Sequence, residues 1–424
     1  MDPILPIVGV LFFVYVLARA FGEIAERLGV PALVGEIAAG IVIANLALGS
    51  FHLEAWLTLD PASATGSLNR EVLTALVEIG IIFLVFAVGL EIRPSELRRV
   101  LPISARTAFF GLLVPFALGA TFLLALQGPG GALTALFVGT ALVVTSLTVT
   151  ARFLRERDLL ATPEARVILG AAVIEDIVGV ILLTFVLGVA ADRGTGASDL
   201  VVQVALVSVF AVAFAAFFLY GAPRLVGRYV DPASPRSPLA RFRTPSAVLA
   251  VAIALCLGAS ALAASFQLAS ILGALFVGMS FAEYRDRLGL ASAFEALTTF
   301  FVPFFFVGIG LLISTGDLAA TWPLASALTL LAIAGKLAGS FVESRHLGRT
   351  AALRVGVGLV PRGEVGIIAA LAGLDAGLLS TDQYTALVVM SVATAIVGPL
   401  ALARLFRRAP TAPPAGPDVA PTGA

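Results

Sequence analysis

The sequence predicts an all-α polytopic membrane protein with thirteen transmembrane helices. Hydrophobic residues make up 59% of the chain, charged residues only 13%, and the mean hydropathy is +1.03. One water-soluble core of this length could not bury so many apolar side chains. Apolar runs of about 20 residues, enough for a helix to cross a bilayer, recur along the chain. Thirteen such runs have centres near Val14, Ile41, Phe83, Val114, Leu142, Val178, Val209, Ala254, Ala274, Val307, Leu331, Arg362 and Ala393.

Arginine placement predicts the orientation, because cytoplasmic loops of membrane proteins carry an excess of positive residues. Loops on one face of the predicted bundle, with the C-terminal flank, hold 22 arginines, whereas loops on the other face hold only Arg70 and Arg193. An odd number of spans places the termini on opposite sides. We therefore expect a multi-pass protein of the cell inner (plasma) membrane, with the N-terminus outside and the C-terminus in the cytoplasm. Arg106 lies near the cytoplasmic end of its span, where its side chain can reach the interface.

Two pairs of segments resemble one another at a fixed offset. LVGEIAAGIVIA (33–44) resembles SILGALFVGMSFA (270–282), and FLVFAVGLEI (83–92) resembles FFFVGIGLLI (304–313). These are spans 2 and 9, then spans 3 and 10. An offset of seven spans gives the two halves opposite membrane orientations, which is typical of secondary transporters. We expect inverted six-helix repeats in a 6+1+6 arrangement.

Five ionisable residues fall deep inside predicted spans, where charge is costly and marks function. They include Lys336, the only lysine in the chain. At ~1.5 Å per residue, Asp176 and Lys336 lie within about 6 Å of the membrane midplane, and the others lie at a similar level. Charges at a common depth can meet. The five are Glu175, Asp176, Lys336, Arg362 and Glu364.

Two of the spans are expected to be broken helices that cross. Span 12 reads VGVGLVPRGEVGIIAA, in which proline removes a backbone donor beside the buried charges. Its counterpart by the repeat, span 5, reads ALVVTSLTVTARF and carries hydroxyls at the same depth. We interpret Arg362 and Glu364 as an ion pair that holds the span 12 break together. Glu36 and Glu78 lie closer to the membrane surfaces, so we expect interfacial hydrogen bonding for both.

The residue types at this depth suit a hard monovalent cation, which binds carboxylate, hydroxyl and carbonyl oxygens. Span 6 supplies the candidate carboxylate ligands, Glu175 and Asp176, and span 5 supplies the candidate hydroxyl ligands, Thr145 and Ser146. A carboxylate away from water binds either a proton or a cation, and this competition can drive exchange. Lys336 can pair with either Glu175 or Asp176, and unlike arginine it can release its proton.

Composition argues against other classes of function. The formal net charge is zero, which does not suit nucleic-acid binding. The chain has one cysteine, two histidines and no HExxH motif, so neither an enzyme site nor a cofactor is expected. A passive channel stays compatible with the composition, but titratable groups at the midplane favour coupled exchange.

In these segments the chain resembles the monovalent cation/proton antiporters, in particular the NapA-like branch of the second cation/proton antiporter family. The resemblance covers nearly all of residues 5–405. Its most specific parts, in combination, come from spans 6, 11 and 12. The matching segments are GVPALVGEIAAGI, EIGIIFLVFAVGLEI, GTALVVTSLTVTARFL, ARVILGAAVIEDIVGVILL, AGKLAGSF and GLVPRGEVGII.

The resemblance implies a homodimer with a moving core, and it implies roles for three residues. Asp176 would bind both the ion and the proton, Glu175 would be the preceding acid, and Lys336 its salt-bridge partner. The similar relatives carry Asp-Asp where this chain has Glu-Asp, which leaves the stoichiometry open. The implied domains are dimer-domain helices in 1–92 and 231–315, core helices in 93–192 and 316–408, a linker helix in 193–230, and a disordered tail in 409–424.

The function expected from these features is exchange of Na⁺ for H⁺, with Li⁺ as a second candidate cation, by an elevator-type alternating-access mechanism that is electrogenic. The alternative is K⁺/H⁺ exchange resembling the Kef-type systems. Those systems usually carry a regulatory domain after the membrane part, and they have Gln-Asp where this chain has Glu-Asp. Both features favour Na⁺.

Overall fold

The computed structural model describes residues 4–48, 51–57, 64–191, 197–231, 236–237, 246–266, 268, 270–313, 315–362 and 364–407. Within these ranges the regular elements are helices, apart from one short antiparallel ladder of β1 (Ala47–Leu48) with β2 (Phe51–His52). Nine helices in the described ranges are long and apolar enough to cross a membrane. The expected all-α polytopic membrane architecture is therefore confirmed.

Most predicted spans correspond to single long helices. These are α1 (Ile4–Arg27), α4 (Ala64–Gly89), α5 (Pro94–Gln127), α8 (Pro163–Ala191), α9 (Ala197–Ala216), α11 (Ser246–Ser265), α13 (Leu290–Leu311), α14 (Thr315–Ser344) and α17 (Thr381–Arg407). After α9 the chain continues through π-helical turns, Phe217–Gly221 and Val226–Val230, on either side of α10 (Ala222–Leu225).

The other predicted spans coincide with short or interrupted helices, so the count of thirteen stays a prediction. They are α2 (Ala32–Asn45), α12 (Ser270–Phe281), and the pairs α6 (Ala132–Ala141) with α7 (Leu147–Glu156) and α15 (Arg349–Gly358) with α16 (Glu364–Asp375). The remaining helical segments are α3 (Leu53–Trp56) and the 3₁₀ turns Pro129–Gly131 and Arg345–Leu347.

One group of helices, α1, α2, α4, α11, α12 and α13, packs together through close glycine crossings. A Cβ on Gly40 or Gly310 would lie 2.1 Å from a backbone oxygen of the opposite helix, where α2 crosses α13. A Cβ on Gly89 or Gly278 would lie 2.4 or 2.2 Å from a backbone oxygen, where α4 crosses α12. Only glycine allows backbones to approach so closely. These residues therefore fix the two crossings.

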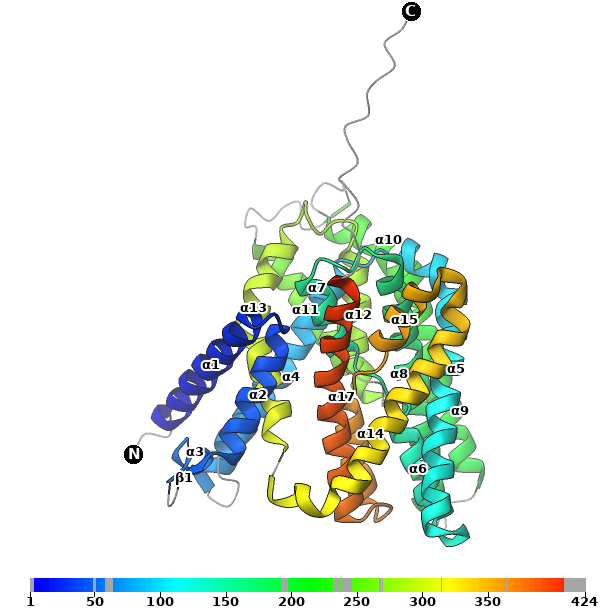
Figure 1. Cartoon of the computed structure of the whole chain (residues 1–424). Helices are drawn as coiled ribbons and strands as arrows, with labels where there is room; N and C mark the ends of the chain where they lie inside the picture. Colours follow the sequence, from blue (N-terminus) through cyan, green and yellow to red (C-terminus); the bar gives the residue numbers. More distant parts are fainter. Residues whose placement is uncertain are drawn as a thin grey trace, which may run out of the picture.

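A second group, α5 to α8 and α14 to α17, packs together. In Figure 1, α1 and α2 lie at one edge, α5, α6 and α9 at the other, and α14 and α17 between them. α7 contacts α4 of the first group and α8 and α17 of the second. The first group consists of helices from the expected dimer domain, and the second consists of helices from the expected core domain. The domain boundaries stay predictions. The expected tail, 409–424, lies outside the described residues.

The interpretation of Glu36 as an interfacial residue is wrong. Its carboxylate is fully buried and takes a bidentate pair of hydrogen bonds from Arg152 of α7, with Nη2 2.8 Å from Oε1 and Nη1 bound to Oε2. The Arg152 guanidinium also donates to Glu156, at 2.6 Å, and lies 4.4 Å from the ring centroid of Phe306. Burial of a charge requires such partners, and this one comes from a helix more than a hundred residues away. Glu78, in contrast, is exposed.

Replacing Glu36 with Gln is expected to destabilise the protein by about 3 kcal/mol, because it leaves the Arg152 charge buried with only Glu156 as an acidic partner. The measurement is thermal unfolding in detergent. Glu23→Gln is the control, since Glu23 pairs with Arg27 at 3.0 Å on the exposed face of α1, where an ion pair contributes little. Equal unfolding temperatures of Glu36→Gln and the wild type would show that the Glu36–Arg152 pair does not stabilise the fold.

Candidate functional site

The two helix interruptions cross and are joined by hydrogen bonds. The first lies at residues 142–146, between α6 and α7, and the second between α15 and α16. The backbone N–H of Ser146 donates to the Pro361 carbonyl at 2.7 Å, and the Thr150 hydroxyl donates to the Gly358 carbonyl at 2.8 Å. Broken helices leave backbone groups without partners, and each break satisfies groups of the other. The crossing expected from the sequence is present.

Ser146 has a local role at this crossing. Its hydroxyl oxygen accepts a hydrogen bond from the Val149 N–H, 3.3 Å away, so it is the N-cap of α7. The same oxygen lies 2.9 Å from the Thr148 hydroxyl. Serine is a favoured N-cap because its oxygen satisfies one of the free N–H groups of the first turn. This explains why span 5 restarts as a helix at Leu147 although the break contains no proline or glycine.

Arg362 binds the first break rather than only its own helix. Its side chain is fully buried, and Nη1 donates to the carbonyls of Val143 at 3.2 Å and Val144 at 2.7 Å and to the Thr145 hydroxyl at 3.1 Å. Carbonyls at a helix end accept such bonds because they lack helical donors. The side chain of Glu364 lies outside the described residues, so the expected Arg362–Glu364 pair stays a prediction.

The carboxylates lie on α8 beside the crossing. Glu175 is fully buried, its Oε2 accepts a hydrogen bond from the Thr145 hydroxyl at 2.6 Å, and the same oxygen lies 2.7 Å from Lys336 Nζ of α14. Asp176, the next residue, is also buried. The sequence left open which acid Lys336 meets. The structure places it on Glu175.

The four charged groups form one electrostatic cluster. Lys336 interacts with Glu175, Arg362 and Asp176, and Arg362 interacts with Glu175. Two acids and two bases make this cluster neutral. Adding a monovalent cation would leave a buried net positive charge unless a proton leaves, and buried net charge is costly. Lys336 can lose a proton, whereas an arginine stays charged. The arrangement can therefore couple cation binding to proton release.

The donor set suits a monovalent cation better than a transition metal. Among the described residues, no group of three or more His, Cys, Asp or Glu side chains is placed to hold a metal ion. Carboxylate, hydroxyl and carbonyl oxygens meet at the crossing, and these are ligands for hard cations. The roles of Asp176 and Ser146 as ligands stay predictions.

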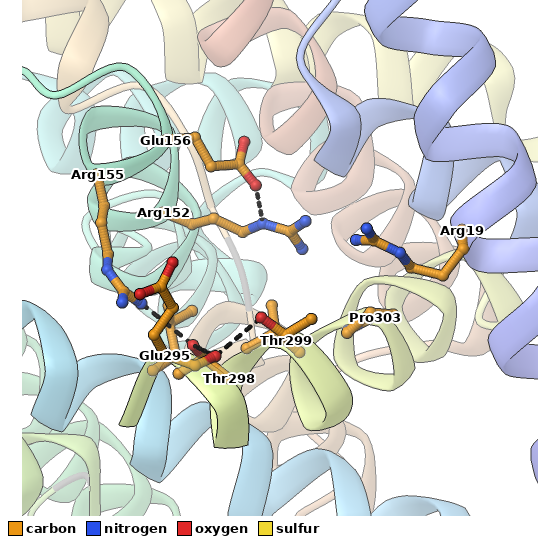
Figure 2. A pocket seen from close by; sticks show the side chains of 10 residues that line it. Arg19, Arg152, Arg155, Glu156, Glu295, Thr298, Thr299 and Pro303 are labelled. Atoms are coloured by element: carbon orange, nitrogen blue, oxygen red, sulfur yellow. Dashed lines mark hydrogen bonds and ion pairs between the residues drawn. The ribbon is translucent and has the colours of Figure 1, made fainter. Parts of the chain in front are cut away.

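A polar cavity lies at the other end of α7, between the two helix groups. Its volume is about 230 Å³, and charged side chains and threonines line most of it. In Figure 2 the guanidinium of Arg19, from α1, points toward that of Arg152 across the cavity, and Thr298 and Thr299 of α13 line another side. Arg155 donates to the Thr298 hydroxyl at 3.3 Å. α7 thus connects the helix crossing to a polar region between the groups.

Comparison with known proteins assigns the family. The family described as sodium/hydrogen exchanger, transmembrane, matches residues 11–408. The chain belongs to this family. The expected membership among monovalent cation/proton antiporters is thereby confirmed, and the NapA-like branch stays a prediction.

Relatives of the exchanger are similar over most of their length. This chain is 32% identical to the high-affinity Na⁺/H⁺ antiporter NhaS3 of Synechocystis sp., over 96% of this chain and 92% of NhaS3. It is 30% identical to the Na⁺/H⁺-K⁺ antiporter GerN of Bacillus cereus, over 91% and 92%. The solved structure of the sodium proton antiporter MjNhaP1 from Methanocaldococcus jannaschii at pH 8 aligns with a TM-score of 0.66 and 16% identity, over 96% of the exchanger and 99% of that chain. This similarity shows a shared fold.

Proposed function

We propose that the exchanger moves Na⁺ across a membrane in exchange for H⁺. The observation that carries the proposal is the buried neutral cluster of Glu175, Asp176, Lys336 and Arg362 beside two crossed helix breaks. Such a cluster has one removable positive charge, the Lys336 proton. The names of two relatives, NhaS3 and GerN, include Na⁺/H⁺ antiport, which supports the same assignment.

In the proposed cycle, Na⁺ binds between Asp176 and the hydroxyls of the first break, and the site loses protons. The Thr145 hydroxyl and Lys336 hold Glu175 in place, so that the change of charge occurs beside Asp176. On the return step Asp176 and Lys336 both carry protons, so the cluster then holds one net positive charge, whereas it is neutral when Na⁺ is bound. Two protons would then move against one Na⁺, which makes the exchange electrogenic. Li⁺ would use the same oxygens.

We further propose an elevator-type motion of the second helix group against the first. The glycine crossings support the repeat that such motion uses. Gly40 and Gly278 hold equivalent positions in the two similar segments, as do Gly89 and Gly310. The repeat relates α2 to α12 and α4 to α13, so the α2–α13 crossing in one half corresponds to the α4–α12 crossing in the other. The buried Glu36–Arg152 pair joins the two groups, so it would break or shift during the motion.

Other parts of the assignment rest on the sequence. The arginine distribution supports an external N-terminus and a cytoplasmic C-terminus in the plasma membrane, and the resemblance supports a homodimer of thirteen-span subunits. K⁺ as the main substrate, the Kef-type alternative, has weaker support. The name of one relative, GerN, does include K⁺ together with Na⁺.

The test of the proposed function is flux in proteoliposomes that contain the purified exchanger and a pH-sensitive dye. An outward or inward gradient of Na⁺, Li⁺ or K⁺ is imposed, and the change of internal pH is recorded. Na⁺-driven proton movement is the expected result. Proton movement with K⁺ alone would support the alternative, and a cation flux independent of the proton gradient would indicate a channel.

Ser146→Ala is expected to raise the KM for Na⁺ several-fold with little change in the maximal rate, because it removes a cation ligand and leaves the proton carriers intact. Loss of the N-cap would also cost stability, about 1 kcal/mol, so Ser146→Thr, which keeps a hydroxyl, should restore the KM. Ser391→Ala is the matched control, since Ser391 is buried and donates to Leu387 of its own helix at 2.9 Å. An unchanged KM would leave Ser146 with only its capping role.

A further inference from the structure

Helices α5 and α14 pack antiparallel, and polar side chains run along the contact in one file. Lys336, Ser340 and Ser344 follow at four-residue intervals on α14, and all three are fully buried. Residues at this spacing share one face of a helix. The file begins at the Lys336–Glu175 pair, and its length is ~12 Å at 1.5 Å per residue.

The inner end of the file surrounds Gly111 of α5. A Cβ on Gly111 would lie 2.6 Å from Glu175 Oε1, 3.1 Å from Ser340 Oγ and 3.7 Å from Lys336 Nζ. The missing side chain therefore lets three polar groups converge on one point. Pro115, inside α5, has no N–H to donate to the Gly111 carbonyl one turn earlier, so that carbonyl lacks its usual helical donor.

Two of these converging atoms lack a partner. Glu175 Oε1 and Ser340 Oγ are buried and have no hydrogen-bond partner within the described part of the chain. Buried polar atoms are costly unless they form hydrogen bonds to protein or to water. The neighbouring residues Gly335 and Gly339 contact α5 through its backbone at Pro115 and Phe110. The contact between α5 and α14 is therefore close-packed at the glycines, and polar groups interrupt the packing at Ser340 and Glu175.

The outer end of the file reaches the surface. The hydroxyls of Ser344 and of Thr107, from α5, share a hydrogen bond of 3.3 Å, and both residues are fully buried. Beside it, Arg106 and Glu343 form an ion pair at 2.9 Å, in which the Arg106 side chain is 61% exposed and that of Glu343 is 20% exposed. One helix contact thus joins a fully buried ion pair to a partly exposed one.

We propose that this hydroxyl file carries protons between the Lys336–Glu175 pair and the surface at Arg106 and Glu343. Serine and threonine hydroxyls both donate and accept, so each can pass a proton on without a net change. In one transfer Lys336 Nζ gives up a proton and becomes a neutral amine, and the Glu343 carboxylate receives the proton and releases it to bulk water. Ser340 and Ser344 lie one helical turn apart, with about 5–6 Å between their Cβ atoms. One water molecule can bridge this gap. The proposal rests on the proposed function and separates the proton route from that of Na⁺.

The test compares Ser340→Ala and Thr107→Val with the wild type in the proteoliposome assay. The expected result is a maximal rate lowered roughly a hundredfold, the lower end of the range of proton-transfer contributions, with the KM for Na⁺ unchanged and a larger solvent isotope effect in D₂O. Ser340→Thr should restore the rate. Ser280→Ala is the matched control, because Ser280 is buried on α12 and donates to Phe276 of its own helix at 2.9 Å.

Each outcome decides a different point. A wild type without Na⁺-driven flux would overturn the proposed function and this route with it. An active wild type that Ser340→Ala and Thr107→Val match in rate and isotope effect would overturn the route alone. A raised KM for Na⁺ in Ser340→Ala would place Ser340 among the cation ligands and would also overturn it. Gel filtration of each variant checks folding, and Thr107→Val keeps the test decisive if Ser340→Ala does not fold.

Discussion

Asp176→Asn is expected to fold and insert but to show no Na⁺-driven proton flux. Asparagine keeps the shape of the side chain, but it has no negative charge for the cation and does not bind a proton in the physiological range. Asp176 is buried beside the Lys336–Glu175 pair, and we assign to it both the cation and a proton. The measurement is the initial rate of dye response after a Na⁺ gradient is imposed.

Asp231→Asn is the matched control for this substitution. Asp231 is also a buried aspartate, but it pairs with Arg287 rather than with the cluster. We expect this variant to exchange at close to the wild-type rate. Near-normal exchange by Asp176→Asn would contradict the assignment of the cation and the proton to Asp176. Glu175 would then be the candidate carrier.

Lys336→Gln is expected to weaken the coupling of exchange to membrane voltage and to change its pH dependence. Lys336 is the removable positive charge of a neutral cluster, and without it the site carries one proton fewer per cycle. In the wild type, a membrane potential would drive the exchange of two protons for one Na⁺ at about 2.3 kcal/mol per charge per 100 mV. The measurement is proton flux with and without a potential clamped by valinomycin and K⁺.

Two further variants separate charge from proton release. Glu175→Gln should resemble Lys336→Gln, because the two side chains are partners at 2.7 Å. Lys336→Arg keeps a positive charge next to Glu175 but cannot release a proton, so it should fold well and still lose the voltage coupling. If the wild type itself is indifferent to voltage, the exchange is one-for-one and Lys336 is a structural counter-ion.

The sequence by itself predicted much of the candidate site, because burial in a membrane makes charged residues conspicuous. One lysine and two adjacent acids at a common depth indicated an electrostatic cluster, since isolated charges there are too costly to keep. Pro361 indicated the second break directly, because proline lacks a backbone donor. The first break contains no proline or glycine, so it was predicted only through the repeat. Ser146, the N-cap of α7, marks the point where the helix starts again.

Other contacts could not be predicted from periodicity or depth. Glu36 looked interfacial because its distance from the end of its span was the only available measure. Arg152, its partner, comes from another helix group. Gly111 gave no signal either, since glycine is common in membrane helices, and its role depends on Ser340 and Glu175 from two other helices.

The sequence alone therefore indicated that the chain crosses a membrane and that two spans break, and it predicted which charges share a common depth. These properties follow from hydropathy, helix rise and backbone chemistry, which act within one segment. Only the tertiary structure decided that Lys336 meets Glu175, that Arg362 binds the carbonyls of Val143 and Val144, and that Glu36 meets Arg152. Depth places a residue at a level in the membrane but does not give its rotation about the helix axis or its neighbouring helix, and those depend on how all the helices pack together.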